Sequence, residues 1–143
     1  MPSIKAKDLH DVVYRLLLAA GADHRNADRV AEALVSSNLS GVDTHGVFHL
    51  PRYVDEINKG TLIPTAWPEL ECETPTSALV KGNWTFGHVV AKVAMEIAIE
   101  KASAQGVAAV GLMRANHIGR LGEYAEMAAA AGMISQVWAS GYG

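Results

Sequence analysis

Residues 86–113, FGHVVAKVAMEIAIEKASAQGVAAVGLM, decide the fold of this chain. The apolar residues of VVAKVAMEIAIEKA recur at helical spacing, and Gly106 is a typical helix stop. The apolar run that follows, residues 107–113, is typical of a buried strand, and another strand is expected before the helix, over SALVKG at 77–82. Because crossovers of this kind are right-handed and join parallel strands, the pattern predicts an α/β fold with a mostly parallel sheet.

The same alternation extends in both directions. A helix is expected from about Leu121 to Ala131 with Gly132 as its stop, and MISQVWAS at 133–140 is typical of one more buried strand. Upstream, LECE at 70–73 predicts a short strand before a turn. From SALVKG onward the expected order is therefore strand, helix, strand, helix, strand.

The first part of the chain is predicted to be helical. One helix is expected over residues 7–20, and a second begins near residues 26–28 and ends before Gly41, which together form a helical hairpin. A shorter helix that ends at Gly60 can hold Pro51 only in its first turn.

Composition changes from helical to mixed between Pro64 and Pro68. We therefore expect an N-terminal helical region over 1–65 and the start of an α/β domain over 66–143. That domain would be incomplete, since its last strand would form an unprotected sheet edge.

Composition also narrows the class of protein. Half of the 143 residues are hydrophobic, the formal net charge is only -3, and no window gathers Lys and Arg with aromatic residues, which argues against a nucleic-acid-binding protein. The single cysteine, Cys72, has no partner for an internal disulfide, as expected in a reducing cytoplasm. Arg15 interrupts the first apolar run, so neither a signal peptide nor a membrane span is predicted.

His117 is the first candidate for chemistry. In an open parallel sheet, ligands bind at the carboxyl ends of the strands, and here that edge carries ANHIG after one strand and SGYG after the next. A histidine at this position can act as a general acid or base near neutral pH. The alternative is a helix-entry histidine that bonds a neighbouring backbone group.

A second group of polar residues lies in DTHGVFHLPRY. His45 follows Thr44 directly, and His49 and Arg52 come next at spacings of about one turn. Hydroxyl and cationic groups suit a carboxylate ligand. The alternative is an ordinary turn in which Asp43 or Thr44 caps the next amides.

Other chemistry is less well supported. A metal site on His45 and His49 lacks the adjacent Glu of the zinc-protease helix motif, so a metal hydrolase is disfavoured. His10, His24 and His88 have no evident partners and are expected at the surface or in an interface. The run GRLGEY lacks the three-glycine dinucleotide fingerprint.

Three blocks in the same order carry a family resemblance over nearly the whole chain: the N-terminal helical pair, DTHGVFHLPRYVDEINKG, and the long block from KGNWTFGHVV to AAAAGMI. The chain resembles the type-2 malate/L-lactate dehydrogenases. The resemblance implies a dehydrogenase or reductase that uses NAD or NADP, a cofactor-binding domain that is not a Rossmann fold, and a cytoplasmic homodimer. Substrates in this family include malate, lactate, ureidoglycolate, sulfolactate and cyclic imino acids, each with a carboxylate beside the reacting carbon.

The resemblance also suggests residue roles. His45 matches the histidine of a Ser-His-Gly block and His117 that of an Asn-His-Gly-type block, and either is a candidate acid or base. Thr44 replaces the usual Ser and keeps its hydroxyl. His49 stands where many members have an Arg that binds the substrate carboxylate, so either the substrate differs or another group supplies the charge. The local candidates for the cation are Arg52, a protonated His49 and Arg120.

Ser140 and Gly141 in the SGYG loop are expected to contact the cofactor. Family chains are longer than this one, so we expect a truncated chain or a piece of one. A non-catalytic folding or dimerisation module of the same family, or a reductase of cyclic imino acids, is the alternative.

Overall fold

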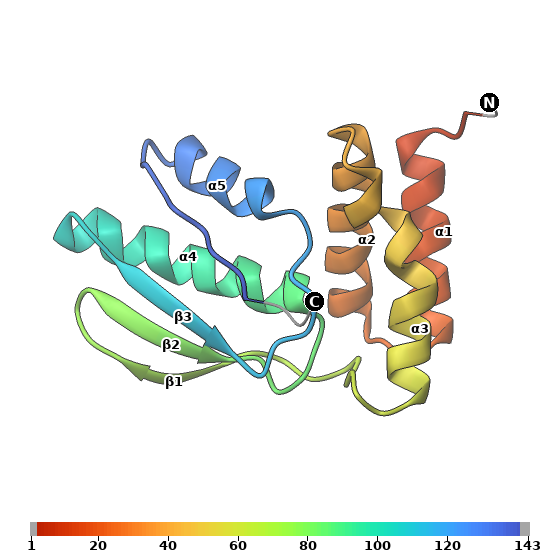
Figure 1. Ribbon diagram of the computed structural model, residues 1–143, viewed down its shortest axis with the longest axis horizontal. Coiled ribbons are helices and arrows are strands. Elements are labelled where there is room, and N and C mark those ends of the chain that lie inside the picture. The colour runs from red at the N-terminus through yellow and green to blue at the C-terminus, as the bar shows by residue number, and fades with distance from the viewer. Residues whose placement is uncertain (1–2, 141–143) are drawn as a thin grey trace. The chain divides into compact units, whose positions relative to one another are not determined.

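A computed structural model of the chain describes residues 3–140. The chain divides into two compact units, Met1–Thr65 and Ala66–Gly143, which are drawn in Figure 1 and described one at a time here. That these units are separate domains with the boundaries predicted above stays a prediction.

Unit 1 consists of helices. Helix α1 (Ala6–Ala19) packs along α2 (His24–Leu39), and two short 3-10 turns, η1 (Asp43–His45) and η2 (Val47–His49), lead into α3 (Leu50–Asn58). Pro51 lies in the first turn of α3 as predicted, where its missing N–H costs nothing.

Helix α2 starts earlier than its apolar pattern indicates. The side chain of Asp23 accepts a 2.7 Å hydrogen bond from the backbone N of Asn26, so the helix begins at His24 instead of near residues 26–28. An Asp in this position satisfies an N–H that the first turn leaves unpaired.

The core of unit 1 is formed by the inward faces of its helices. Each of the following side chains is at most 1% exposed: Val13, Leu17, Val30, Leu34 and Tyr53. Burial of such side chains contributes roughly 1.5–3 kcal/mol each, which makes this core the main source of stability of the helical unit.

Unit 2 is an α/β unit. Strands β1 (Glu69–Glu73) and β2 (Ser77–Lys81) are antiparallel, and β2 is parallel to β3 (Ala109–Met113), in the order β1-β2-β3. Helix α4 (Gly87–Gln105) connects β2 to β3 and packs against both strands, and α5 (Leu121–Ala130) follows β3 (Figure 1). The predicted α/β class is confirmed.

The core of unit 2 lies between α4 and the sheet. Val80 of β2 packs with Val90 and Ala94 of α4, and Val110 and Leu112 of β3 cover them. Gly106 has φ +84°, the left-handed conformation that ends α4 at the predicted position.

The sheet differs from the predicted one in two ways. It is mixed and not mostly parallel, because the short β1–β2 connection allows only antiparallel pairing. The predicted final strand is also wrong: residues 133–140 form no strand, with Ile134 fully exposed and Trp138 79% exposed. An apolar, β-branched run predicts an extended chain, but no strand of the described residues pairs with it.

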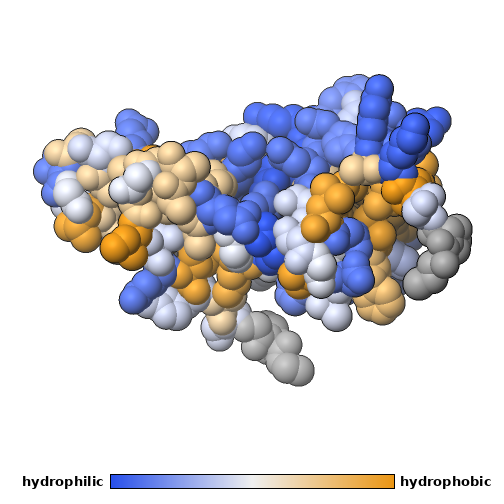
Figure 2. All heavy atoms as spheres, turned by 90° about the horizontal axis from the view of Figure 1, so that it is seen from above, coloured by the Kyte–Doolittle hydropathy of each residue, from blue (hydrophilic) through white to orange (hydrophobic). Residues whose placement is uncertain are grey.

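Strand β3 is likewise less buried than predicted, since its side chains range from partly buried to exposed. Figure 2 shows apolar side chains gathered over α5 and the segment that follows it. Among residues 3–140, none of the helices is long and apolar enough to span a membrane.

Candidate active site

Two loops lie side by side at the carboxyl ends of the parallel strands β2 and β3. The backbone N of Gly82 donates to Met113 O, and that of Trp84 donates to Arg114 O, each at 2.8 Å. Ligands of open α/β sheets bind at this edge.

The backbone of these loops is strained. Of the non-glycine residues that the structure describes, only Asn83, Trp84 and Arg114 have positive φ, at 51°, 61° and 51°. Such conformations cost energy and cluster at functional sites, so they favour this edge as the functional one.

Loop 116–119, which carries His117, is held on its first side by the segment before α4. The side-chain amide of Asn116 donates to the carbonyl oxygens of Trp84 at 2.7 Å and Thr85 at 3.2 Å. A Cβ placed on Gly87 would lie 2.1 Å from Asn116 O and 2.3 Å from His117 O, so only glycine allows this close approach.

The other side of the loop is anchored to α5. The hydroxyl of the buried Tyr124 donates a short hydrogen bond to Ile118 O. Since Arg120 is the N-cap of α5, His117 lies three residues before the N-cap and does not occupy the capping position. His117 is therefore a partly buried side chain on a loop that is fixed from both sides.

His88 is the neighbour of His117, and its predicted position at the surface or in an interface is wrong. Its side chain is only 1% exposed, in the first turn of α4, with the two ring centroids 5.9 Å apart and the rings at 79°. Sequence reasoning missed it because periodicity places His88 beside apolar residues without revealing which loop covers it.

Arg120 is already paired. Its guanidinium binds the Glu126 carboxylate through two hydrogen bonds, of 2.7 and 2.8 Å. The hydrogen bond to Glu126 raises the pKa of Arg120, and the same bond lowers that of Glu126. The positive charge of Arg120, which the sequence suggested as a partner for the substrate carboxylate, is thus neutralised by Glu126 within unit 2.

In unit 1, the structure brings the residues of the DTHGVFHLPRY group together. Thr44 Oγ1 lies 3.1 Å from His45 Nδ1, and the rings of His45 and His49 are 6.1 Å apart. His49 stacks on the buried Tyr53, with ring centroids at 5.8 Å. The N-cap position of η1 is occupied by Val42, which makes no side-chain cap, so the alternative of a cap by Asp43 or Thr44 stays a hypothesis.

The charges of this group are influenced by its neighbours, and the predicted roles of Arg52 and His49 in carboxylate binding stay predictions. Arg52 Nε donates to Glu56 Oε1 at 2.8 Å, so its charge is compensated. The pKa of His49 is lowered, first by burial and then by the positive charges of Arg52 and His45. A protonated His49 is therefore disfavoured at neutral pH.

Asn38 is a residue of this site that the sequence did not point to. Its Nδ2 donates to Asp43 Oδ1 at 2.6 Å, and its Oδ1 accepts from the backbone N of Val47 at 2.9 Å. A Cβ on Gly46 would lie 2.2 Å from that oxygen. Asn38 thus fixes the turn that carries Thr44 and His45. The only sequence signal for this role is the presence of an Asn in the last turn of α2, a few residues before Asp43.

The remaining predicted residues lie at the end of the chain. Ser140 is exposed, and Gly141 lies outside the described residues. Within residues 3–140, no group of three or more His, Cys, Asp or Glu side chains is placed to hold a metal ion.

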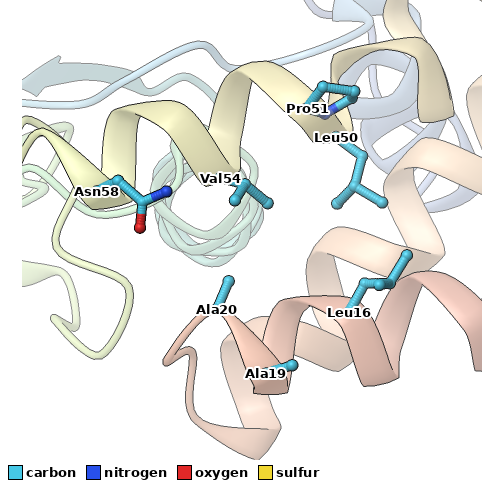
Figure 3. A pocket seen from close by; sticks show the side chains of 7 residues that line it. All are labelled: Leu16, Ala19, Ala20, Leu50, Pro51, Val54 and Asn58. Atoms are coloured by element: carbon cyan, nitrogen blue, oxygen red, sulfur yellow. The ribbon is translucent and has the colours of Figure 1, made fainter.

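Unit 1 also carries an apolar groove of about 570 Å³ between α1 and α3. Figure 3 shows the side chains that line it: Leu16, Ala19, Ala20, Leu50, Pro51, Val54 and Asn58. None of these can transfer a proton or bind a carboxylate through charge, so the groove is not the candidate active site.

These observations define an α/β protein with a fixed histidine loop at the carboxyl edge of its sheet. The model of the malate/L-lactate dehydrogenase family matches residues 4–142, and the chain belongs to that family.

Two curated relatives show how far the similarity extends. L-sulfolactate dehydrogenase of Methanothermobacter thermautotrophicus is 40% identical over 129 residues, which cover 90% of this chain and 38% of the relative. Ureidoglycolate dehydrogenase (NAD(+)) of Escherichia coli O157:H7 is 35% identical over 131 residues, which cover 92% of this chain and 38% of the relative. The chain thus spans less than two fifths of either relative.

Solved structures agree with this assignment. Malate dehydrogenase from Entamoeba histolytica superposes with a TM-score of 0.87 at 36% identity, over 92% of this chain and 37% of that one. Delta1-piperideine-2-carboxylate reductase from Pseudomonas syringae superposes with a TM-score of 0.85 at 25% identity, over 92% of this chain and 40% of that one.

Proposed function

We propose that this chain is part of a nicotinamide-dependent oxidoreductase that interconverts small 2-oxo and 2-hydroxy carboxylates, with His117 as the proton-transfer group. The observation that carries the proposal is the construction of the His117 loop. Hydrogen bonds to Asn116 and Tyr124 and the close approach at Gly87 fix a partly buried histidine at the ligand-binding edge of the sheet.

Family membership supports the reaction class. Dehydrogenases of sulfolactate and ureidoglycolate act, by their names, on acids that carry a hydroxyl group, and the name of the latter gives NAD(+) as cofactor. When bound, the nicotinamide supplies or accepts the hydride.

The residues of unit 2 fit the reacting end of such a cofactor. His117 is fixed yet partly exposed, as a group that meets a substrate must be. The N-terminus of α4 does not suit a pyrophosphate, because the carbonyl oxygens of residues 116 and 117 already lie against Gly87. This favours a cofactor site outside the Rossmann pattern, with Ser140 and Gly141 as proposed contacts.

His117 is proposed to move one proton. In the reduction of a 2-oxo acid it donates that proton to the oxygen as hydride reaches carbon, and in the reverse direction it takes the proton from the hydroxyl. The fixed loop holds the imidazole at one place during this step, which removes the entropy cost of orienting it.

Thr44, His45, His49 and Arg52 are proposed to bind the substrate. The hydroxyl of Thr44 and the imidazole N–H groups of His45 and His49 donate hydrogen bonds to a carboxylate. Arg52 is proposed to act while paired with Glu56, as a hydrogen-bond donor and not as a free charge. We place the protein in the cytoplasm, in line with its single free cysteine. The homodimer is proposed on the family resemblance alone.

A reductase of cyclic imino acids is the second candidate, favoured by the likeness to delta1-piperideine-2-carboxylate reductase. The same proton would then go to nitrogen. Steady-state oxidation of NADH and NADPH by the complete gene product, with pyruvate, oxaloacetate and piperideine-2-carboxylate as substrates, distinguishes the two. Equal turnover of ketones without a carboxylate, or no turnover of any substrate with either cofactor, would refute the proposed function.

A further inference from the structure

We propose that His88 is a positioning residue for His117, a role that rests on the proposed function. It lies in the first turn of α4, and its ring packs edge to face against that of His117 at a centroid distance of 5.9 Å. His117 is partly exposed, whereas His88 is 1% exposed. One imidazole thus meets the solvent while the other supports it from inside.

Gly119 leaves space for the His88 ring, and this space is called the seat of the ring. A Cβ on Gly119 would lie 2.4 Å from His88 Nε2 and 2.7 Å from its Cδ2. Gly119 also has φ +74°, so two independent features of this position require glycine. The ring of His88 therefore contacts the loop on both sides of Ile118, at His117 and at Gly119.

The chemistry of His88 argues against simple filling of space. Burial of an imidazole costs more free energy than burial of a leucine of similar size, because its nitrogens leave water. Val89 and Val90, its neighbours in α4, are equally buried and apolar. A histidine among them indicates that the nitrogen-bearing ring has a use that an aliphatic side chain lacks.

The use of the His88 ring is to set the orientation of the His117 ring. A displacement of a reacting group by about 1 Å can lower a rate a hundredfold, so a rigid neighbour that blocks other ring positions acts on turnover and not on substrate binding.

Two substitutions that differ by one methylene test this role in the complete gene product. The amide of His88→Gln reaches the place of Nε2 beside Gly119, whereas that of His88→Asn stops at the place of Nδ1 and leaves the seat empty. We expect His88→Asn to lower kcat by tenfold or more with KM within about twofold of the wild type. We expect His88→Gln to keep at least a third of wild-type kcat.

A double-mutant cycle separates positioning from packing. In a His117→Gln background, His88→Asn should change kcat by less than twofold, because the group through which it acts is gone. The Cε1–H signal of His117 in spectra of labelled histidine should also shift in His88→Asn, while that of His10, in unit 1, stays in place.

Equal kcat in the wild type and His88→Asn, equal loss in both His88 variants, or the same loss with and without His117 would overturn the role of His88. A full rate in His117→Gln alone would instead refute the assignment of His117. The His117 signal then still reports whether the two rings are in contact, so the two failures are distinguishable.

Discussion

Replacement of Gly87 by Ala is expected to damage the His117 loop although it should favour the helix. Gly87 is the first residue of α4, and in a helix interior Ala is more favourable than Gly by about 1 kcal/mol. A Cβ at this position would nevertheless lie 2.1 Å from Asn116 O, 2.3 Å from His117 O and 2.5 Å from His117 C. All three are backbone atoms, so no side chain can turn away to make room.

The loop must therefore move by roughly 1 Å to reach ordinary contact distance. Overpacking of this kind costs about 1–3 kcal/mol, and the greater helix propensity of Ala offsets up to about 1 kcal/mol of it. We expect a net loss of about 1–2 kcal/mol, which corresponds to a fall in Tm of about 3–7 °C for a chain of this size. Turnover should fall further than stability, since the displaced atoms belong to His117.

Thermal and urea unfolding of Gly87→Ala, followed by circular dichroism, measure the stability, and steady-state kinetics measure kcat. Ser103→Ala is the matched control, because Ser103 is exposed on the same helix and its replacement tests helix propensity alone. If Gly87→Ala were as stable and as active as Ser103→Ala, the close contact between α4 and the His117 loop would be refuted.

Three further outcomes are expected. Asn38→Ala should lower the free energy of unfolding by about 1–2 kcal/mol in urea titrations and weaken substrate binding, because it removes two hydrogen bonds, one of them from the Val47 backbone; unchanged unfolding would contradict this. Because the pKa of His49 is lowered in the folded protein, the unfolded chain binds the proton more readily, so the stability that this residue contributes above its unfolded pKa near 6.5 is lost as pH falls. The free energy of unfolding of the wild type should therefore decrease more than that of His49→Gln between about pH 7 and 5. Parallel curves for the two proteins would contradict this prediction. Tyr124→Phe removes the hydrogen bond to Ile118 O and should lower the free energy of unfolding by about 1 kcal/mol. It should also lower kcat, and an unchanged kcat would show that this hydrogen bond does not position the His117 loop.

The elements that were predicted correctly are those that depend on local sequence signals. Helix α4 and its end at Gly106, and Pro51 in the first turn of α3, follow from periodicity and from the φ preferences of single residues. The start of α2 was placed too late because apolar periodicity does not register the polar cap at Asp23.

What depends on partners distant in sequence could not be predicted in the same way. Residues 133–140 have the composition of a strand, but composition does not supply a neighbouring strand. The pairing of Arg120 with Glu126 and the burial of His88 are likewise tertiary facts, since each depends on how a loop folds over a helix.

The candidate site was predicted as residue types and not as an arrangement. The position of His117 after a strand and that of His45 in a turn indicated candidate acid or base residues. The roles proposed for them stay predictions. Asn38 was missed because its hydrogen bonds join the end of α2 to the following turn, a contact with no periodic signature.

Comparison of His117→Gln with His45→Gln in the complete gene product, by single-turnover and steady-state kinetics with NADH or NADPH and a 2-oxo acid, tests the central claim most directly. We expect His117→Gln to lower kcat by about a hundredfold or more with KM little changed, as the loss of a general acid should, and His45→Gln to act mainly on KM. If instead His45→Gln abolished turnover while His117→Gln altered only KM, the proton-transfer role would belong to His45, contrary to this account.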